Sequence, residues 1–470
     1  MPYDGERASA LGHVPAMHER AAFSQIMGRW RQDMSNIAAT AAVPLLRDSA
    51  ALPTRPPVNL VIAVDGSEAI VQDGYVYEGI YQFGSVVMDL DEYKAAAGGI
   101  GAPVDRRRYN ASIHKQQLHL LLPCGGFTPS AHNGDEWDLW RAEVFAQLRD
   151  LVLPITPSKS LSLLDCFMLS HNGPGSAASS VTIAKCPVCH EQDIEVPANP
   201  VTCSCGTTLY PTDFLRTVED FEPGERGGAA FGRIGAVAER LLTILYIEYM
   251  VANHKERMGT TLLVTDGPLA FFGPTAPMKT AFLSYWRRLS LLAKNEGFDM
   301  PALIGVEKTG AWVNFAKSLE MSPGQYLMPD NRFIVRHIKR GAKGARLGAR
   351  SYGADDYYGR HVIYAPRSGG CIVFTVMRTS GAPYTEIDNT DESDPQNYES
   401  LGQVLRAIDE LTFVANRDAL VPVMEAHKAV SIPTRKVNLL HEMVRQAHGG
   451  QLSKVEAMAS RPPAQYRGQR

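Results

Sequence analysis

Two continuous apolar runs in the sequence each end in an aspartate that is followed directly by glycine. Residues 59–65 read NLVIAVD, and residues 260–266 read TTLLVTD. A short, continuous apolar run is typical of a strand that is covered on both faces. We therefore expect two buried strands, each of which delivers a carboxylate, Asp65 or Asp266, to an exposed turn.

The rest of the hydrophobic pattern predicts strands alternating with helices. Residues 68–90 predict two more strands with a turn at Gln72-Asp73-Gly74, so that Asp65 ends the first strand of a three-strand meander. Residues 300–310 and 369–378 predict further strands. Apolar residues at three-to-four spacing predict helices over residues 21–50, 133–152, about 232–256, 275–297, 398–411 and 421–433. Together these elements indicate an α/β protein.

The length and composition of the chain favour one large core with additions. The chain has 470 residues, of which 45% are apolar, and residues 171–180 (HNGPGSAASS) predict a flexible joint. We expect an N-terminal helical segment at 1–56, a core in two parts with an insert between them, and a disordered, Pro/Arg-rich tail. The two core parts are assigned to residues 57–180 and 216–450, the insert to 181–215, and the tail to 451–470.

Charge restricts the kind of partner. With 47 basic and 50 acidic residues the formal net charge is −3, which excludes a globally basic nucleic-acid coat protein. One local run, RHIKRGAKGARLGAR, has no acid and could track a phosphate backbone. The alternative is a solvated, flexible loop. The candidate DNA-binding residues in this run are Arg336, Lys339, Arg340, Lys343, Arg346 and Arg350.

The N-terminal sequence and the cysteines point to a reducing compartment. The first twenty residues contain early acids and no apolar core, so they do not read as a secretory signal, and no apolar run is long enough for a membrane span. Of the seven cysteines, four fall within twenty residues. A cytoplasmic location fits this distribution better than a disulfide framework does.

The four clustered cysteines have the spacing of a zinc site. Cys186-x-x-Cys189 and Cys203-x-Cys205 are separated by thirteen residues, enough for the chain to return to the same point. Four thiolates on two tight turns bind Zn²⁺ tetrahedrally and leave no open position, so the predicted role is structural. His190 is a possible substitute ligand.

The two Asp-Gly pairs predict a second kind of metal site. Two carboxylates at the ends of neighbouring strands repel each other unless a cation lies between them. Mg²⁺ or Mn²⁺ is bound through such oxygens while it keeps waters for substrate phosphates, and two such ions about 3.5–4 Å apart can support phosphodiester cleavage. The alternative is that Asp-Gly simply makes turns.

A third acid on the helix before Asp266 would complete this site. The strand from residue 260 to 266 spans about 20 Å, and an antiparallel helix needs about thirteen residues to return the same distance. That count leads from the helix end near 253–255 to residues 239–242, which favours Glu239. Glu248, alone in LLTILYIEYMVA, is the other candidate.

Two further polar residues are candidates for the chemistry. Lys308 follows an apolar strand in GVEKTG, which lacks the glycines of a phosphate-binding P-loop at positions 302 and 307. Lys308 could still reach a substrate phosphate, although a solvated surface lysine is the alternative. His427 lies on a predicted helix, where a lone histidine is more often structural.

Five motifs in a fixed order resemble the NurA nuclease family. They are VDGS, TDGPLA, GVEKTG, YYGRHVIY and EAHKAVSI, spread over roughly residues 55–435. The chain looks most like the bacterial branch of that family, whose core carries a zinc-ribbon-like insert. The resemblance implies an RNase H-like fold, a Mn²⁺- or Mg²⁺-dependent DNase, and catalytic residues at Asp65, Glu239, Asp266 and His427. The long segment 89–180 and the insert have no counterpart in the minimal archaeal form.

The resemblance also implies partners. NurA nucleases work with a HerA-type hexameric ATPase that translocates DNA, and a homodimer is expected. The role would be DNA end processing in repair, or defence against foreign DNA. A different class of function remains open, namely a non-catalytic adaptor that uses the same shell and zinc ribbon to bind DNA or the ATPase.

Overall fold

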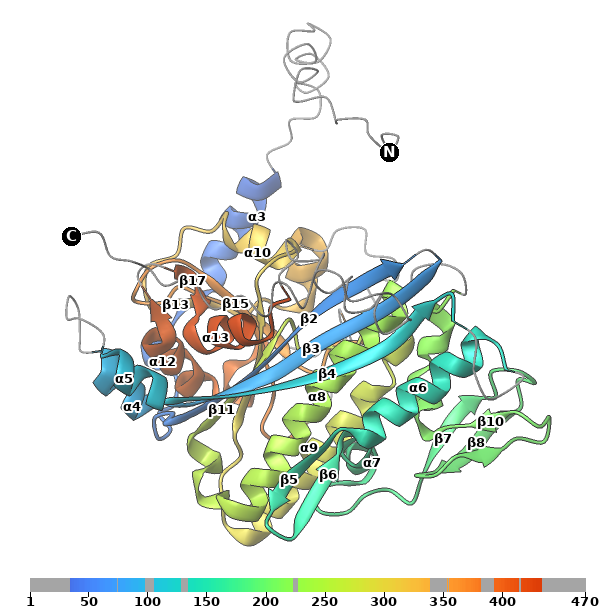
Figure 1. Cartoon of the computed structure of the whole chain (residues 1–470). Helices are drawn as coiled ribbons and strands as arrows, with labels where there is room; N and C mark the ends of the chain where they lie inside the picture. Colours follow the sequence, from blue (N-terminus) through green and yellow to red (C-terminus); the bar gives the residue numbers. More distant parts are fainter. Residues whose placement is uncertain are drawn as a thin grey trace, which may run out of the picture.

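A computed structural model describes residues 34–73, 75–97, 105–127, 134–222, 227–338, 353, 355–381, 393–413 and 416–432. Within these residues, nine strands form one mixed sheet (Figure 1). The strands, in spatial order, are β1 (Leu46–Asp48), β13 (Gln325–Leu327), β14 (Arg360–Tyr364), β15 (Ile372–Val376), β12 (Ala302–Glu307), β11 (Thr261–Asp266), β2 (Leu60–Asp73), β3 (Val76–Asp89) and β4 (Ile113–Gly125).

Three central strands are parallel, and helices cover both faces of the sheet. β2, β11 and β12 run in the same direction, whereas the neighbouring pairs are antiparallel. One face packs against α8 (Gly228–Asn253) and α9 (Met278–Glu296), and the other against α12 (Leu401–Leu411) and α13 (Val421–Val430). Burial on both faces is what the continuous apolar runs predicted. The chain is therefore an α/β protein with a large mixed sheet flanked by helices.

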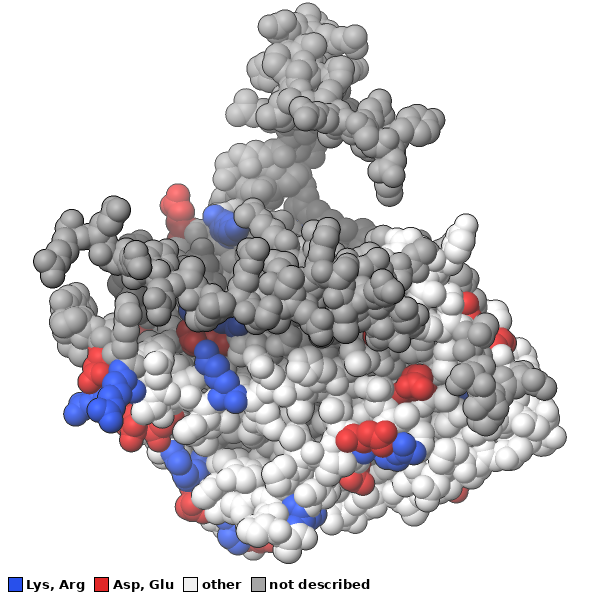
Figure 2. Space-filling view, in the orientation of Figure 1, with Lys and Arg blue, Asp and Glu red and all other residues white. Residues whose placement is uncertain are grey.

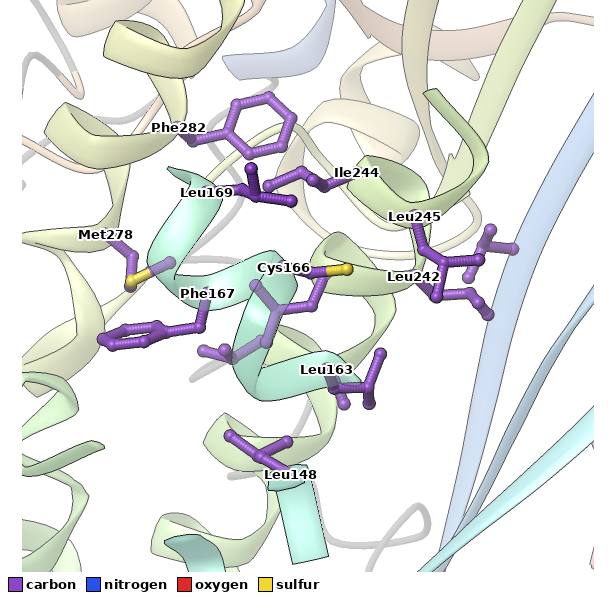
Figure 3. Close-up of a cluster of buried hydrophobic side chains, with 14 of the residues drawn as sticks. Leu148, Leu163, Cys166, Phe167, Leu169, Leu242, Ile244, Leu245, Met278 and Phe282 are labelled. Carbon is purple, nitrogen blue, oxygen red and sulfur yellow. The ribbon is translucent and has the colours of Figure 1, made fainter. Parts of the chain in front are cut away.

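The largest core lies between the sheet and a layer of three helices. Figure 3 shows α7 (Leu163–Asn172) inserting Cys166, Phe167 and Leu169 between α8 and α9. α6 (Glu136–Asp150) lies along β4 and adds Leu148 to this core. Most residues of α8 between Ala230 and Met250 are buried, so any carboxylate on its buried face needs a specific partner.

The first strand continues past Asp65, which corrects the predicted turn at Asp65-Gly66. β2 extends from Leu60 to Asp73, and Gly66 pairs with Phe83 in the middle of the β2–β3 hairpin. The cause is β3, which pairs with β2 along its whole length, whereas β11 pairs with it only as far as Val64. Asp65 is therefore not at a strand end but at the point where β2 loses its parallel neighbour.

The remaining elements follow the predictions with some exceptions. α6, α8, α9, α12 and α13 lie within or close to the predicted helices, β12 and β15 lie on predicted strands, and Asp266 does end β11. The helix predicted at 21–50 is described only as α3 (Met34–Ala42), and residues before 34 lie outside the described part. After α3, Pro44 opens a 3₁₀ turn (Val43–Leu45) and β1 follows. The elements that were not predicted include β4, β13, β14, α4 (Leu90–Ala97), α5 (Arg106–Ala111) and α7.

The insert forms two small hairpins beside the main body. They are β7 (Ser180–Lys185) with β8 (Gln192–Pro197), and β9 (Val201–Thr202) with β10 (Thr208–Leu209). Ile183, Val196 and Leu209 form a small core of their own between them. No helix among the described residues is long and apolar enough to cross a membrane.

Candidate active site and cysteine cluster

Parallel pairing brings Asp65 and Asp266 to the same place on the sheet. Val64 pairs with Thr265, so the next residue of each strand is one of the two aspartates. In both strands the alternate residues before the aspartate belong to the core under α12 and α13, so both carboxylates project toward that face. Asp65 is 1% exposed, whereas the Asp266 side chain is 27% exposed.

Lys308 lies between these two carboxylates. It follows the third parallel strand, β12, whose Val306 pairs with Asp266. Its ammonium nitrogen is 3.1 Å from Oδ2 of Asp266 and 3.5 Å from Oδ2 of Asp65. Three neighbouring parallel strands thus deliver two acids and one base to one point, and the chain itself supplies the cation that the acid pair requires.

The buried Asp65 carboxyl also contacts α13. Nδ1 of His427 is 3.2 Å from Oδ2 of Asp65, and the amide of Gly66 donates to Oδ1 at 2.8 Å. Burial raises the pKa of Asp65 to about 8; the neighbouring Asp266 raises it further and Lys308 opposes the shift. His427 is 54% exposed, so the solvent reaches this corner of the site from the α13 side.

Glu239 reaches the same region from the opposite face of the sheet. It lies on α8, is 6% exposed, and accepts a hydrogen bond at Oε1 from the hydroxyl of Tyr81 at 2.5 Å. Arg240 donates to its Oε2 at 3.1 Å. Burial raises the pKa of Glu239 to about 7, while Arg240 and Tyr81 oppose the rise and Asp266 adds to it.

The absence of a side chain at Gly66 lets Glu239 approach the strand. A Cβ at this position would overlap Oε1 of Glu239 and the hydroxyl of Tyr81. Glu239 also raises the pKa of Asp65, although more weakly than Asp266 does. The three acids are therefore electrostatically coupled across the point where β11 ends.

Glu248, the other candidate for the third acid, lies elsewhere. Its carboxylate accepts hydrogen bonds from the hydroxyl of Tyr285 at 2.9 Å and from the amide of Gly175 at 3.1 and 3.2 Å. Arg240, next to Glu239, instead donates to the carbonyl of Pro268 at 3.1 Å and to that of Asp266 at 3.4 Å. Glu239 is thus level with the end of β11, as the helix and strand rises indicated.

Sequence reasoning missed two residues of this region, Tyr81 and Arg240. Arg240 had a signal, because Glu239-Arg240 is a charged pair inside the otherwise uncharged stretch from residue 234 to 247 of the predicted helix. Tyr81 had none, since its hydrogen bond to Glu239 spans 158 positions of the sequence.

The four cysteines come together as predicted. Their sulfur atoms all lie within 4.8 Å of one another, with Sγ–Sγ distances of 3.9 Å for Cys186–Cys205 and 3.6 Å for Cys189–Cys203. Tetrahedral Zn²⁺ with Zn–S bonds of about 2.3 Å places its sulfurs about 3.8 Å apart. The cluster could therefore hold zinc without rearrangement.

The carboxylates are less tightly grouped than the cysteines. In the described part of the chain, the cysteine cluster is the one set of three or more His, Cys, Asp or Glu whose ligand atoms approach within 4.8 Å of one another. Asp65, Asp266 and Glu239 do not meet that limit. A cation that bound all three would have to draw them together and displace the ammonium of Lys308.

The candidate DNA-binding run is described only at its start. Arg336 lies in a single helical turn, Ile334–Ile338. Lys339, Arg340, Lys343, Arg346 and Arg350 lie outside the described residues. On the face in Figure 2, the described Lys and Arg side chains are scattered among Asp and Glu and do not gather in one patch.

Comparisons with known proteins give distant structural matches. No protein-family model matches the chain, and no curated protein sequence matches it. Among solved structures, the NurA nuclease from Sulfolobus solfataricus covers 93% of this chain and 96% of its own, with 8% identity and a TM-score of 0.31. A second NurA structure has 9% identity and a TM-score of 0.27, with coverages of 92% and 98%. A structure of NurA with manganese has 10% identity and a TM-score of 0.24, with coverages of 92% and 99%.

Proposed function

We propose that this protein is a divalent-metal-dependent DNA nuclease built on an RNase H-like core. The observation that carries the proposal is the convergence of Asp65, Asp266 and Lys308 from three neighbouring parallel strands. A buried pair of like charges costs stability, and a surface that only binds a partner has no need of it. A buried carboxyl with a raised pKa, such as Asp65, next to specific charged partners is typical of catalytic sites.

Asp65 and Asp266, with Glu239 as the third acid, would hold Mg²⁺ or Mn²⁺. Their oxygens are the hard donors that these ions prefer. When bound, such ions activate water for attack on a phosphodiester and stabilise the leaving oxygen. The lysine between the two aspartates marks the position where the protein already tolerates positive charge.

The chain's own residues would supply the remaining functions. Lys308 is 36% exposed at its side chain, so its ammonium could leave the carboxylates and pair with a substrate phosphate. His427 faces solvent and contacts Asp65, so it could orient a phosphate or accept or donate a proton. Either residue fits either role.

The wider assignment rests on the resemblance of the five sequence motifs to NurA nucleases. It includes a HerA-type hexameric ATPase as partner, a homodimer, and a role in DNA end processing or in defence. The four cysteines would hold a structural Zn²⁺, because a closed Cys₄ site leaves no position for substrate. The basic run from Arg336 to Arg350 would contact the DNA backbone.

A non-catalytic adaptor is the alternative, and one experiment separates the two. Purified protein is incubated with linear and circular DNA, with Mn²⁺ or with EDTA, and with and without the ATPase. The proposal expects cleavage that requires the divalent ion and disappears in EDTA. Binding of DNA or ATPase without any cleavage, under all these conditions, would favour the adaptor.

A further inference from the structure

A hydrogen bond from Tyr81 to Glu239 links the sheet to the one acid of the candidate active site that lies on a helix. Tyr81 is 7% exposed and lies on β3, one strand away from Asp65. Its hydroxyl donates to Oε1 of Glu239 at 2.5 Å. A hydrogen bond to a charged acceptor is stronger than one between neutral groups.

Two glycines make room for this arrangement. A Cβ on Gly235, one helical turn before Glu239, would overlap the ring of Tyr81, and a Cβ on Gly66 would overlap its hydroxyl. Neither glycine has a positive φ that would itself require glycine. Glycine is needed at these two positions because a side chain would overlap Tyr81, and not because of the backbone conformation.

Arg240 fixes the second oxygen of the same carboxylate. It is 5% exposed, donates to Oε2 of Glu239 at 3.1 Å, and also donates to the Pro268 carbonyl and the Tyr358 hydroxyl, both at 3.1 Å. Its charge is therefore shared between the acid on α8 and the backbone that follows Asp266. Glu239 is held at both oxygens relative to the end of β11.

Held in this way, Glu239 keeps free acceptor capacity. A carboxylate has about four lone-pair sites, and Tyr81 and Arg240 use one on each oxygen. The remaining sites are available to a cation or to a water molecule bound to it. The two donors fix the direction in which these sites point.

We propose that Tyr81 is a positioning residue for the divalent-metal site, acting through the orientation of Glu239. This inference rests on the proposed nuclease function. It differs from a purely structural role, in which the hydrogen bond would merely tie β3 to α8. Removing a donor that orients a metal ligand typically changes metal affinity or activity by about 10- to 100-fold.

The chain contains a matched control for the structural alternative. The hydroxyl of Tyr246 on α8 lies 2.5 Å from Oγ of Ser85 on β3 and donates to Oε1 of Gln116 on β4 at 3.0 Å. Tyr246 therefore also joins α8 to β3 through a tyrosine hydroxyl at the same distance. It is two helical turns, about 10.5 Å, from Glu239, and contacts no acid of the site.

The test compares Tyr81→Phe with Tyr246→Phe. Mn²⁺ binding is measured by titration calorimetry without DNA, and cleavage is measured as a function of Mn²⁺ concentration. We expect Tyr81→Phe to weaken Mn²⁺ binding, and to raise the Mn²⁺ concentration for half-maximal cleavage, by about 10- to 100-fold. Tyr246→Phe should leave both unchanged, while the two variants lose similar amounts of thermal stability.

A second measurement isolates the path through Glu239. In a Glu239→Gln background, Tyr81→Phe should have no further effect on Mn²⁺ binding, because the residue it positions has already lost its charge. The inference is overturned if the wild-type protein binds Mn²⁺ and cleaves DNA and Tyr81→Phe does both equally well. It is also overturned if Tyr246→Phe weakens binding as much. A wild-type protein that neither binds Mn²⁺ nor cleaves DNA would overturn the proposed function as well.

Discussion

Lys308 places its ammonium nitrogen 3.1 Å from the carboxylate of Asp266 and 3.5 Å from that of the nearly inaccessible Asp65. The metal-free protein therefore carries its own cation at the acid pair. A divalent ion and Lys308 would compete for one position. This competition can be measured without substrate, as the effect of Mn²⁺ on the melting temperature.

Replacing either aspartate should abolish cleavage and preserve the fold. Asp65→Asn or Asp266→Asn removes a charge that contributes several kcal/mol of transition-state stabilisation in metal-assisted hydrolysis, so we expect a loss of about 1,000-fold in rate. Folding stability should hold or rise by about 1 kcal/mol, because each change relieves repulsion. Cleavage rate and melting temperature are the two measurements. Asp91→Asn, on an exposed side chain, is the control, and full activity in either site variant would refute the assignment.

Removing Lys308 should increase the stabilisation that the protein gains from bound Mn²⁺. Lys308→Met leaves the two carboxylates without a counter-ion, so the metal-free protein should melt at a lower temperature. Saturating Mn²⁺ should then raise the melting temperature more than in the wild type, since an ion that binds only the folded state stabilises it. Lys317→Met, at an exposed position after α10 (Ala311–Ala316), should behave like the wild type in both respects. An equal Mn²⁺ response in Lys308→Met and wild type would contradict the competition.

The cysteine cluster should retain one Zn²⁺ per chain. Elemental analysis of protein purified without added metal measures this directly. The double variant Cys186→Ser, Cys203→Ser should lose the metal, whereas Cys371→Ser, outside the cluster, should keep it. Because the site is closed, added zinc should not replace Mn²⁺ in cleavage. Zinc that persisted in the double variant would rule out the Cys₄ site.

His171 should make the protein less stable in mild acid. Burial lowers the pKa of His171 to about 4, and its ring packs edge-on against Phe167 and Phe214. Between pH 6.5 and 4, His171 is therefore protonated in the unfolded chain and neutral in the folded chain. The free energy of unfolding is therefore unaffected by this group above pH 6.5 and decreases as the pH falls toward 4, by about 3 kcal/mol.

The matching experiment is denaturant unfolding of the wild type and of His171→Phe at several pH values. The difference in unfolding free energy between them should change across pH 4–6.5 and stay constant above pH 7. His119→Gln, on the exposed side of β4, should show no such change relative to the wild type. A difference that is independent of pH would mean that His171 is not held neutral.

The basic run should set the salt dependence of DNA binding. Arg340→Ala, Lys343→Ala and Arg346→Ala together should lower affinity for single-stranded DNA, because each phosphate contact contributes about 0.7–0.9 to the slope of log affinity against log salt. The combined loss is therefore up to about 2–3 in slope. Fluorescence anisotropy across a salt series measures it, and ATPase pull-down should be retained. An unchanged slope would indicate a solvated loop and direct attention to Arg106–Arg108.

The sequence was sufficient where local pattern and simple geometry decide the outcome. The cysteine spacing predicted a cluster that the structure brings together, and the helix and strand rises placed Glu239 level with Asp266. It was insufficient where a distant partner decides. The Asp65-Gly66 pair had the local signature of a turn, but β3 pairs across it and extends the strand. Tyr81 could not be predicted as part of the site, because its partner Glu239 lies 158 positions away and no local pattern around Tyr81 indicates that contact.

The packing of Gly66 and Gly235 around one tyrosine has a consequence for sequence variation. Both glycines leave space that the Tyr81 ring and hydroxyl fill. A larger residue at 235 requires a smaller one at 81, and a smaller residue at 81 opens a cavity that a larger one at 235 could fill. Position 66 is restricted by Glu239 as well, so it stays glycine whatever residue stands at 81. Among relatives of this chain, positions 81 and 235 should therefore covary, and sequences that lack the tyrosine should have alanine or serine at position 235.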